Sequence, residues 1–186
     1  MRKVLAVLML CVLTAGCWVS NGSLYRGVTP VQPLRTGKVV SQPEDPKERS
    51  HWVLTRQMDG AYRLTNADKG TSDFGDAYVV RFFTLTGLPK GSFVFEAVAD
   101  DKCEPGKDCN RMTAASERYY GLMRLTRNGA EVTSPDCDKA SAAAQLPGVR
   151  AGDYGICTFT SRASLESALK AQATKSWKIN LTYRYE

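Results

Sequence analysis

The sequence predicts a mainly β fold of the α+β class. We expect an antiparallel sheet of about seven to eight strands, folded as a sandwich or half-open barrel, with one C-terminal helix packed on it. From residue 51 onward, short segments alternate apolar and polar residues and are separated by turn-forming residues. Alternation of this kind is typical of antiparallel strands with one buried and one wet face, whereas parallel strands are buried on both faces.

Turn signals join three pairs of predicted strands. Asp-Gly, Pro-Lys-Gly and Asn-Gly sequences stand between the members of each pair, and each favours a tight reversal of the chain. The predicted hairpins are 51–56 with 60–66, 77–88 with 92–99, and 118–127 with 130–134.

The C-terminal part combines strands with a helix. Residues 154–161 predict a strand, and 163–174 predict a helix because Leu165, Ala168 and Leu169 share one apolar arc. The final segment, 177–186, alternates along its length and predicts a strand with one packed face. Its apolar side consists of Trp177, Ile179, Leu181, Tyr183 and Tyr185.

The first sixteen residues have the character of a cleaved signal peptide. Arg2 and Lys3 precede an apolar run from Val4 to Ala15, which ends in small residues. The run is shorter than the roughly 20 apolar residues that a membrane-spanning helix needs. We therefore expect residues 1–16 to be removed on export.

The segment LTAGC, residues 13–17, resembles the lipobox of bacterial lipoproteins. The resemblance implies that Cys17 is acylated, with palmitate among the attached acyl chains, and that it becomes the first residue of the mature chain. In that family an aspartate after the cysteine favours retention in the inner membrane. Trp18 at this position therefore implies the outer membrane, with the domain in the periplasm or at the cell surface.

Residues 17–48 are predicted to be a flexible tether, and residues 49–186 a single domain. The tether segment contains four prolines and shows neither strand nor helix periodicity. A flexible chain of this length would span roughly 30 Å. The alternative for part of it is an edge strand at 37–41.

Four cysteines remain after Cys17, and an even number in an exported chain indicates two disulfides. Three pairings are open. The Pro-Gly turn between Cys103 and Cys109 favours a local bridge, which would pair Cys137 with Cys157. Their spacings do not fit a zinc site, and no calcium-binding loop occurs, so no metal is expected.

The charge pattern does not indicate nucleic-acid binding. Removing Arg2 and Lys3 lowers the formal net charge from +6 to +4, and the remaining basic residues are scattered. No phosphate-binding loop or dinucleotide fingerprint occurs, so no cofactor is expected.

Each candidate for catalysis fails a physical requirement. Ser167 and Lys170 match a Ser-x-x-Lys pair but are expected to face water, where lysine keeps its proton. His51 could act as a base, but the sequence contains no serine or cysteine nucleophile motif that it could activate, and His51 is expected at the surface. Of the carboxylates Glu96 and Glu117, the first is expected on the wet face of its strand.

The expected function is therefore non-catalytic. We expect a binding or envelope-assembly module whose partners are the membrane, through its lipid, and an envelope protein or polysaccharide. Because Tyr119 and Tyr120 are neighbours in a strand, one must point away from the core and is a candidate partner contact. The alternatives are a small-ligand carrier with an apolar cavity under the helix, and an envelope hydrolase using two carboxylates.

Overall fold

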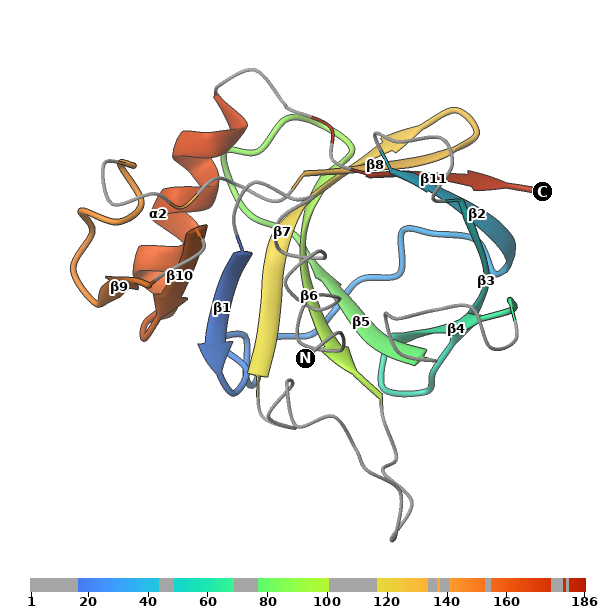
Figure 1. The fold of residues 1–186 in the computed structure, drawn as a ribbon, viewed down its shortest axis with the longest axis horizontal. Helices are drawn as coiled ribbons and strands as arrows, with labels where there is room; N and C mark the ends of the chain where they lie inside the picture. Colours follow the sequence, from blue (N-terminus) through green and yellow to red (C-terminus); the bar gives the residue numbers. More distant parts are fainter. Residues whose placement is uncertain are drawn as a thin grey trace, which may run out of the picture.

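The computed structural model describes residues 17–43, 49–68, 77–100, 117–133, 137, 141–152, 155–174, 179 and 181–186. In this part of the chain, eleven strands form one sheet, and eight of them close into an antiparallel barrel (Figure 1). The eight are β2 (Gly37–Pro43), β3 (Ser50–Arg56), β4 (Tyr62–Asn66), β5 (Ala77–Phe83), β6 (Ser92–Ala99), β7 (Glu117–Thr126), β8 (Gly129–Thr133) and β11 (Leu181–Tyr185).

The predicted mainly β fold with one C-terminal helix is confirmed, and the barrel is closed rather than half-open. Closure depends on the last strand, β11, which is distant in the chain from both of its partners. It pairs with β8 on one side and with β2 on the other, whereas the consecutive strands β6 and β7 pair directly. The three predicted hairpins form β3–β4, β5–β6 and β7–β8.

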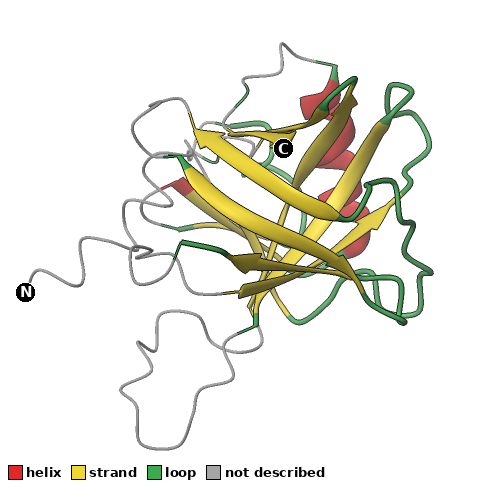
Figure 2. Ribbon diagram, turned by 90° about the vertical axis from the view of Figure 1, so that its right-hand side faces the viewer, coloured by secondary structure: helices red, strands yellow, loops and turns green. Residues whose placement is uncertain are grey.

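Three further strands extend the sheet beyond the barrel. The first half of β7 pairs with β1 (Cys17–Asn21), which runs parallel to β10 (Ile156–Phe159). The edge is β9 (Val149–Ala151). The helix α2 (Arg162–Ala173) lies outside the ring of strands, at the left of Figure 1, and it is therefore seen behind the strands in Figure 2.

The helix forms where the sequence predicts it. The Ser161 side chain accepts a hydrogen bond from the backbone N–H of Ser164 and so caps the first turn. Leu165, Ala168 and Leu169 are buried against the sheet, as the apolar arc predicts. The described helix is not long and apolar enough to cross a bilayer.

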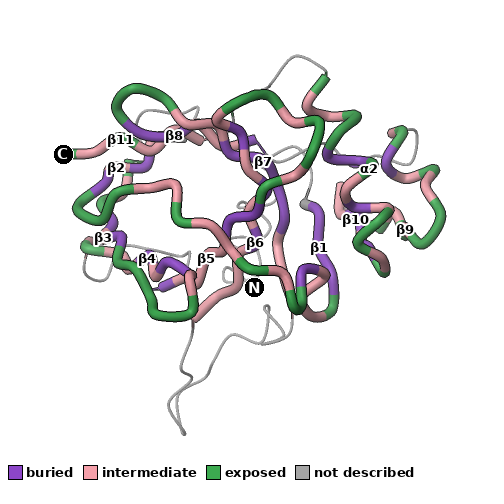
Figure 3. Tube along the Cα trace, turned by 180° about the vertical axis from the view of Figure 1, so that it is seen from behind, coloured by how far each residue is buried: buried purple, intermediate pink, exposed green. Residues whose placement is uncertain are grey.

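The predicted tether is wrong for the residues that the structure describes. Residues 17–21 and 37–43 are strands, and β2 lies between β3 and β11 rather than at an edge. The segment between β1 and β2 crosses one open end of the barrel (Figure 3). It is attached there by the Val31–Phe82 bridge and by Leu34, whose N–H donates to the Tyr62 hydroxyl at 3.0 Å. The prolines that suggested a tether suit this irregular crossing, and isolated apolar residues hold it in place.

The two faces of the barrel wall are both covered. Inside, the barrel is filled by a cluster that includes Trp52, Tyr62, Phe82 and Met123. Gly121 belongs to this packing, because a Cβ there would lie 2.6 Å from the Phe95 ring. Outside, β1, α2 and residues 24–28 cover β5–β7 with a second apolar cluster. It comprises Trp18, Tyr25, Phe83, Val94, Tyr120, Leu122, Cys137, Ala143, Cys157, Phe159, Leu165, Ala168 and Leu169.

Candidate functional site

The strongest candidate site starts from a row of side chains across three strands. Glu96 of β6 lies directly opposite Arg81 of β5 and Tyr120 of β7. Directly opposed residues point to the same face of a sheet. Because Phe82 and Phe95 belong to the interior cluster, their neighbours Arg81 and Glu96 point out of the barrel.

Glu96 is buried although it lies on the outer face. Only 2% of the residue is exposed, because the segment after β1 lies over it. The Ser23 hydroxyl donates to Oε2 at 2.7 Å, and the Tyr120 hydroxyl donates to the same oxygen at 2.9 Å. The other oxygen, Oε1, is buried and has no hydrogen-bond partner among the described residues. Burying an unpaired oxygen is costly, so this arrangement needs an explanation beyond packing.

Tyr120 connects the carboxylate to the segment above it. Its hydroxyl oxygen accepts the backbone N–H of Leu24 at 3.0 Å and lies 3.0 Å from the Ser20 hydroxyl. Burial raises the pKa of Tyr120 well above that of a free tyrosine. The phenol therefore keeps its proton and remains a donor to Glu96.

A cleft of about 350 Å³ opens beside this network. This is near the lower end of the range of small-molecule sites, which is about 300 to 1,000 Å³. Its apolar wall includes the stacked rings of Tyr25 and Phe83, whose centroids are 4.3 Å apart. Its charged residues are three arginines and two carboxylates: Arg26, Arg81, Arg118, Asp59 and Glu96.

The arginines give the cleft an excess of positive charge. One of them, Arg81, pairs with Asp59 at 2.6 Å. The hydrogen bond from Arg81, followed by that from the Ala61 N–H, holds the pKa of Asp59 below its usual range. Asp59 therefore stays ionised at neutral pH and orients Arg81. The cleft can bind an acidic group through guanidinium donors and a hydrogen-bond donor through Glu96.

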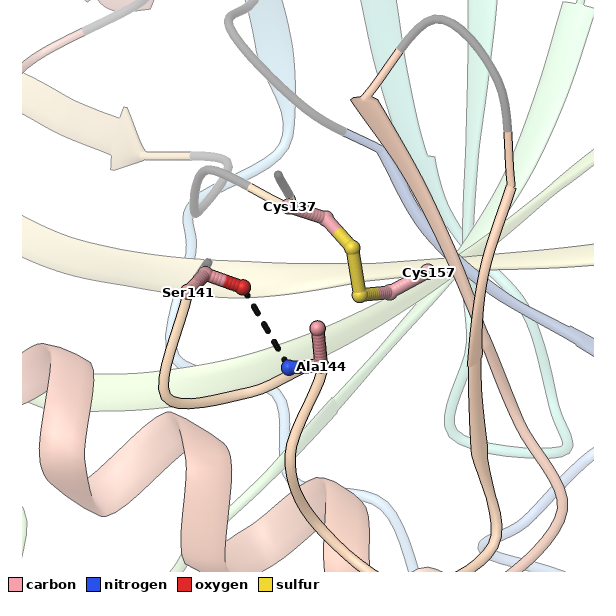
Figure 4. Close-up of a disulfide and its surroundings, with 4 residues drawn as sticks. All are labelled: Cys137, Ser141, Ala144 and Cys157. Atoms are coloured by element: carbon pink, nitrogen blue, oxygen red, sulfur yellow. Dashed lines mark hydrogen bonds between the residues drawn. A yellow bond between two sulfur atoms is a disulfide. The ribbon is translucent and has the colours of Figure 1, made fainter. Parts of the chain in front are cut away.

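The cysteine predictions have a mixed outcome. Cys137 and Cys157 form the predicted disulfide, with Cα atoms 5.5 Å apart, beside the turn in which Ser141 accepts the N–H of Ala144 (Figure 4). Cys103 and Cys109 lie outside the described residues, so their bridge stays a prediction. Cys17 begins β1, and its acylation stays a prediction.

The two candidate contact tyrosines differ in exposure. Tyr120 is only 1% exposed, so the prediction that it contacts a partner is wrong. It is the buried member of the pair because β1 and residues 20–24 cover its side of β7. Tyr119 is half-buried and donates to Glu117 at 3.0 Å, and its role as a partner contact stays a prediction.

The residues that the sequence offered for catalysis differ in exposure. Ser167 and Lys170 are both exposed on α2, as predicted. The side chain of His51 is 49% exposed and interacts with Asp68, 3.0 Å from Nδ1. No cluster of three or more potential metal ligands occurs in the described ranges. The expectation that Glu96 faces water is wrong, because the predicted tether covers its face of β6.

Sequence reasoning missed most of this cleft. Ser23 and Arg26 belong to the predicted tether, and Arg81 and Arg118 were part of a scattered basic surface. No local motif marks these residues. They are brought together by the pairing of neighbouring strands and by residues 23–30, which lie over the outer face of the sheet. Comparison with protein-family models, curated proteins and solved structures finds no match to this chain.

Proposed function

We propose that this protein is an exported lipoprotein of the outer membrane whose domain is a non-catalytic binding module of the cell envelope. The leader and the LTAGC segment support export and acylation of Cys17. The buried Cys137–Cys157 disulfide suits an oxidising compartment outside the cytoplasm.

The binding site of this module is the arginine-lined cleft. The observation that carries this proposal is the buried Glu96 carboxylate, which has one unpartnered oxygen and lines a cleft with three guanidinium groups. A ligand that carries both an acidic group and hydroxyl or amide donors matches these charges. Acidic saccharides of the envelope have this chemistry.

The ligand proposal is tested with two sugars that differ in one group. We expect N-acetylmuramate to shift the NMR signals of residues 23–28, whereas N-acetylglucosamine, which lacks the carboxylate, binds much more weakly. Arg26→Gln should weaken binding of the acidic sugar by about tenfold or more, since hydrogen bonds to charged groups contribute about 1.5 to 3 kcal/mol. The matched control is Lys38→Gln, which removes an exposed cation from β2. Equal binding of both sugars would contradict the proposed role of the arginines.

The anchor is tested separately. Cys17→Ser should abolish incorporation of labelled palmitate and release the protein from membranes. Crosslinking in the native envelope, followed by mass spectrometry, would then identify a protein partner. Retention of the Cys17→Ser variant on membranes would contradict a lipid anchor.

Hydrolysis of an envelope polymer is the second candidate function, because two carboxylates line the same cleft. Asp59 is held ionised by Arg81, as a base or nucleophile must be, and Glu96 would have to serve as the acid. The test is release of reducing sugars from peptidoglycan by the wild-type protein and its loss in Glu96→Gln. A ligand carrier is less well supported, because the hollow described beside α2 measures only about 100 Å³.

A further inference from the structure

The first strand begins at the residue that we propose to be acylated. In the backbone register, Cys17 lies opposite Ile156 of β10, and Trp18 lies opposite both Cys157 and Tyr120. Trp18 is 2% exposed, and its ring packs against Phe159 with a centroid separation of 5.0 Å. The residue next to the lipid attachment site is therefore part of the hydrophobic core.

This position leaves no room for a spacer between membrane and domain. A flexible tether to Glu48 would let the domain move roughly 30 Å from the bilayer. Because Cys17 is itself the first residue of β1 and pairs with Ile156 of β10, no spacer residue separates the lipid attachment site from the sheet. The strands next to Cys17 must then lie close to the lipid headgroups.

Beyond β1 and β10, the sheet ends at its edge strand β9. Neighbouring strands are about 4.8 Å apart, so β9 lies about 10 Å from β1 across β10. Val149 and Ala151 pack against the outer core cluster, whereas Arg150 between them is exposed. A cation on a short edge strand suits the phosphates of anionic phospholipids.

We propose that the β9 edge, with Arg150, rests on the anionic headgroups of the membrane that holds the chain. The proposal depends on the lipid anchor proposed above. It assigns a fixed orientation to the domain, with the β9–β10–β1 extension of the sheet toward the bilayer.

The test compares two acylated proteins in vesicles of phosphatidylethanolamine and phosphatidylglycerol. One is the wild-type chain, and the other carries a 20-residue Gly/Ser insertion between Cys17 and Trp18. Hydrogen exchange is measured in the peptide that contains residues 149–151. We expect severalfold slower exchange in wild type than in the insertion variant, and equal rates once both are released into detergent.

Two charge reversals serve as matched variants. Arg150→Glu should reduce the protection of β9 in wild-type vesicles, and Lys38→Glu, which reverses an exposed charge on β2, should leave it unchanged. Equal exchange in the two acylated proteins would overturn the proposal while leaving the anchor intact. Failure of the wild-type chain to incorporate labelled palmitate would instead overturn the proposed lipid anchor.

Discussion

Replacement of Trp18 by alanine separates the folded role of the N-terminal segment from the tether that the sequence suggests. In a tether this residue would be exposed, and its removal would not change the free energy of unfolding. In the structure it is 2% exposed and lies in the cluster between β1, β10 and α2. All variants are compared in the Cys17→Ser background, so that every protein is free of lipid.

The expected loss of stability follows from two opposing contributions. A buried tryptophan removes about 150 to 250 Å² from water, which corresponds to about 4 to 6 kcal/mol at 25 cal/mol per Å². This is an upper estimate, because the unfolded chain already buries part of this surface. The buried Nε1 has no hydrogen-bond partner among the described residues, and its removal recovers about 1 to 3 kcal/mol. We expect Trp18→Ala to cost about 3 kcal/mol.

Urea unfolding followed by circular dichroism measures this cost. With a slope of about 2 kcal/mol per molar urea, the midpoint should fall by about 1.5 M without a change in slope. Trp18→Phe keeps a ring against Phe159 and removes the unpaired N–H, so its cost should stay within about 1 kcal/mol. Thr29→Ala, an exposed position in the same segment, should change stability by less than about 0.5 kcal/mol. A Trp18→Ala midpoint equal to that of its parent would refute the placement of β1 in the core.

Three further changes have defined outcomes. The double variant Cys137→Ala, Cys157→Ala removes a disulfide of sequence separation 20 and should lower the free energy of unfolding by about 3 kcal/mol. In a thermal scan this corresponds to a fall in Tm of about 6 to 12 °C. An unchanged Tm would contradict a structural role for the disulfide. Arg81→Gln should raise the pKa of Asp59 toward its usual value in an NMR titration. A carboxyl group whose pKa is lower in the folded than in the unfolded protein stabilises the fold at pH values above its unfolded pKa. Arg81→Gln should therefore lose a small part of the free energy of unfolding at neutral pH and differ least from wild type in acid. The reverse pH dependence would contradict the pairing. Tyr120→Phe removes the hydroxyl that donates to the buried Glu96 carboxylate and should lower the free energy of unfolding in urea by about 1 to 3 kcal/mol. An unchanged free energy of unfolding would show that water replaces the phenol hydroxyl.

The elements that the sequence predicts correctly are those whose information is local. The hairpin turn at Asn128-Gly129 and the apolar arc of α2 each lie within a few neighbouring residues. By contrast, β1 has only five residues, and its partners on β7 and β10 lie about a hundred or more positions away. Barrel closure also depends on residues far apart in the sequence, because β11 pairs with β2 from the other end of the domain.

Glu96 shows why the site could not be predicted even where the strand was. Alternation along β6 correctly places Glu96 on the face opposite Phe93 and Phe95. It cannot tell which of the two faces water, because that depends on what covers each face. Here residues 20–25 cover the outer face, so the residue expected in water is more buried than the phenylalanines inside the barrel.

One N-terminal segment therefore has three structural roles in this fold. It supplies β1 next to the proposed lipid, contributes Ser23 and Arg26 to the cleft, and closes one end of the barrel through Leu34. A spacer can change in length without affecting the domain that it carries, because it makes no contacts with that domain. Here, release of the segment would unpair β1, remove a donor from Glu96 and open the barrel end together. The proposed anchor and the proposed binding site consequently depend on the same folded residues, and a change in the length of this segment should impair both.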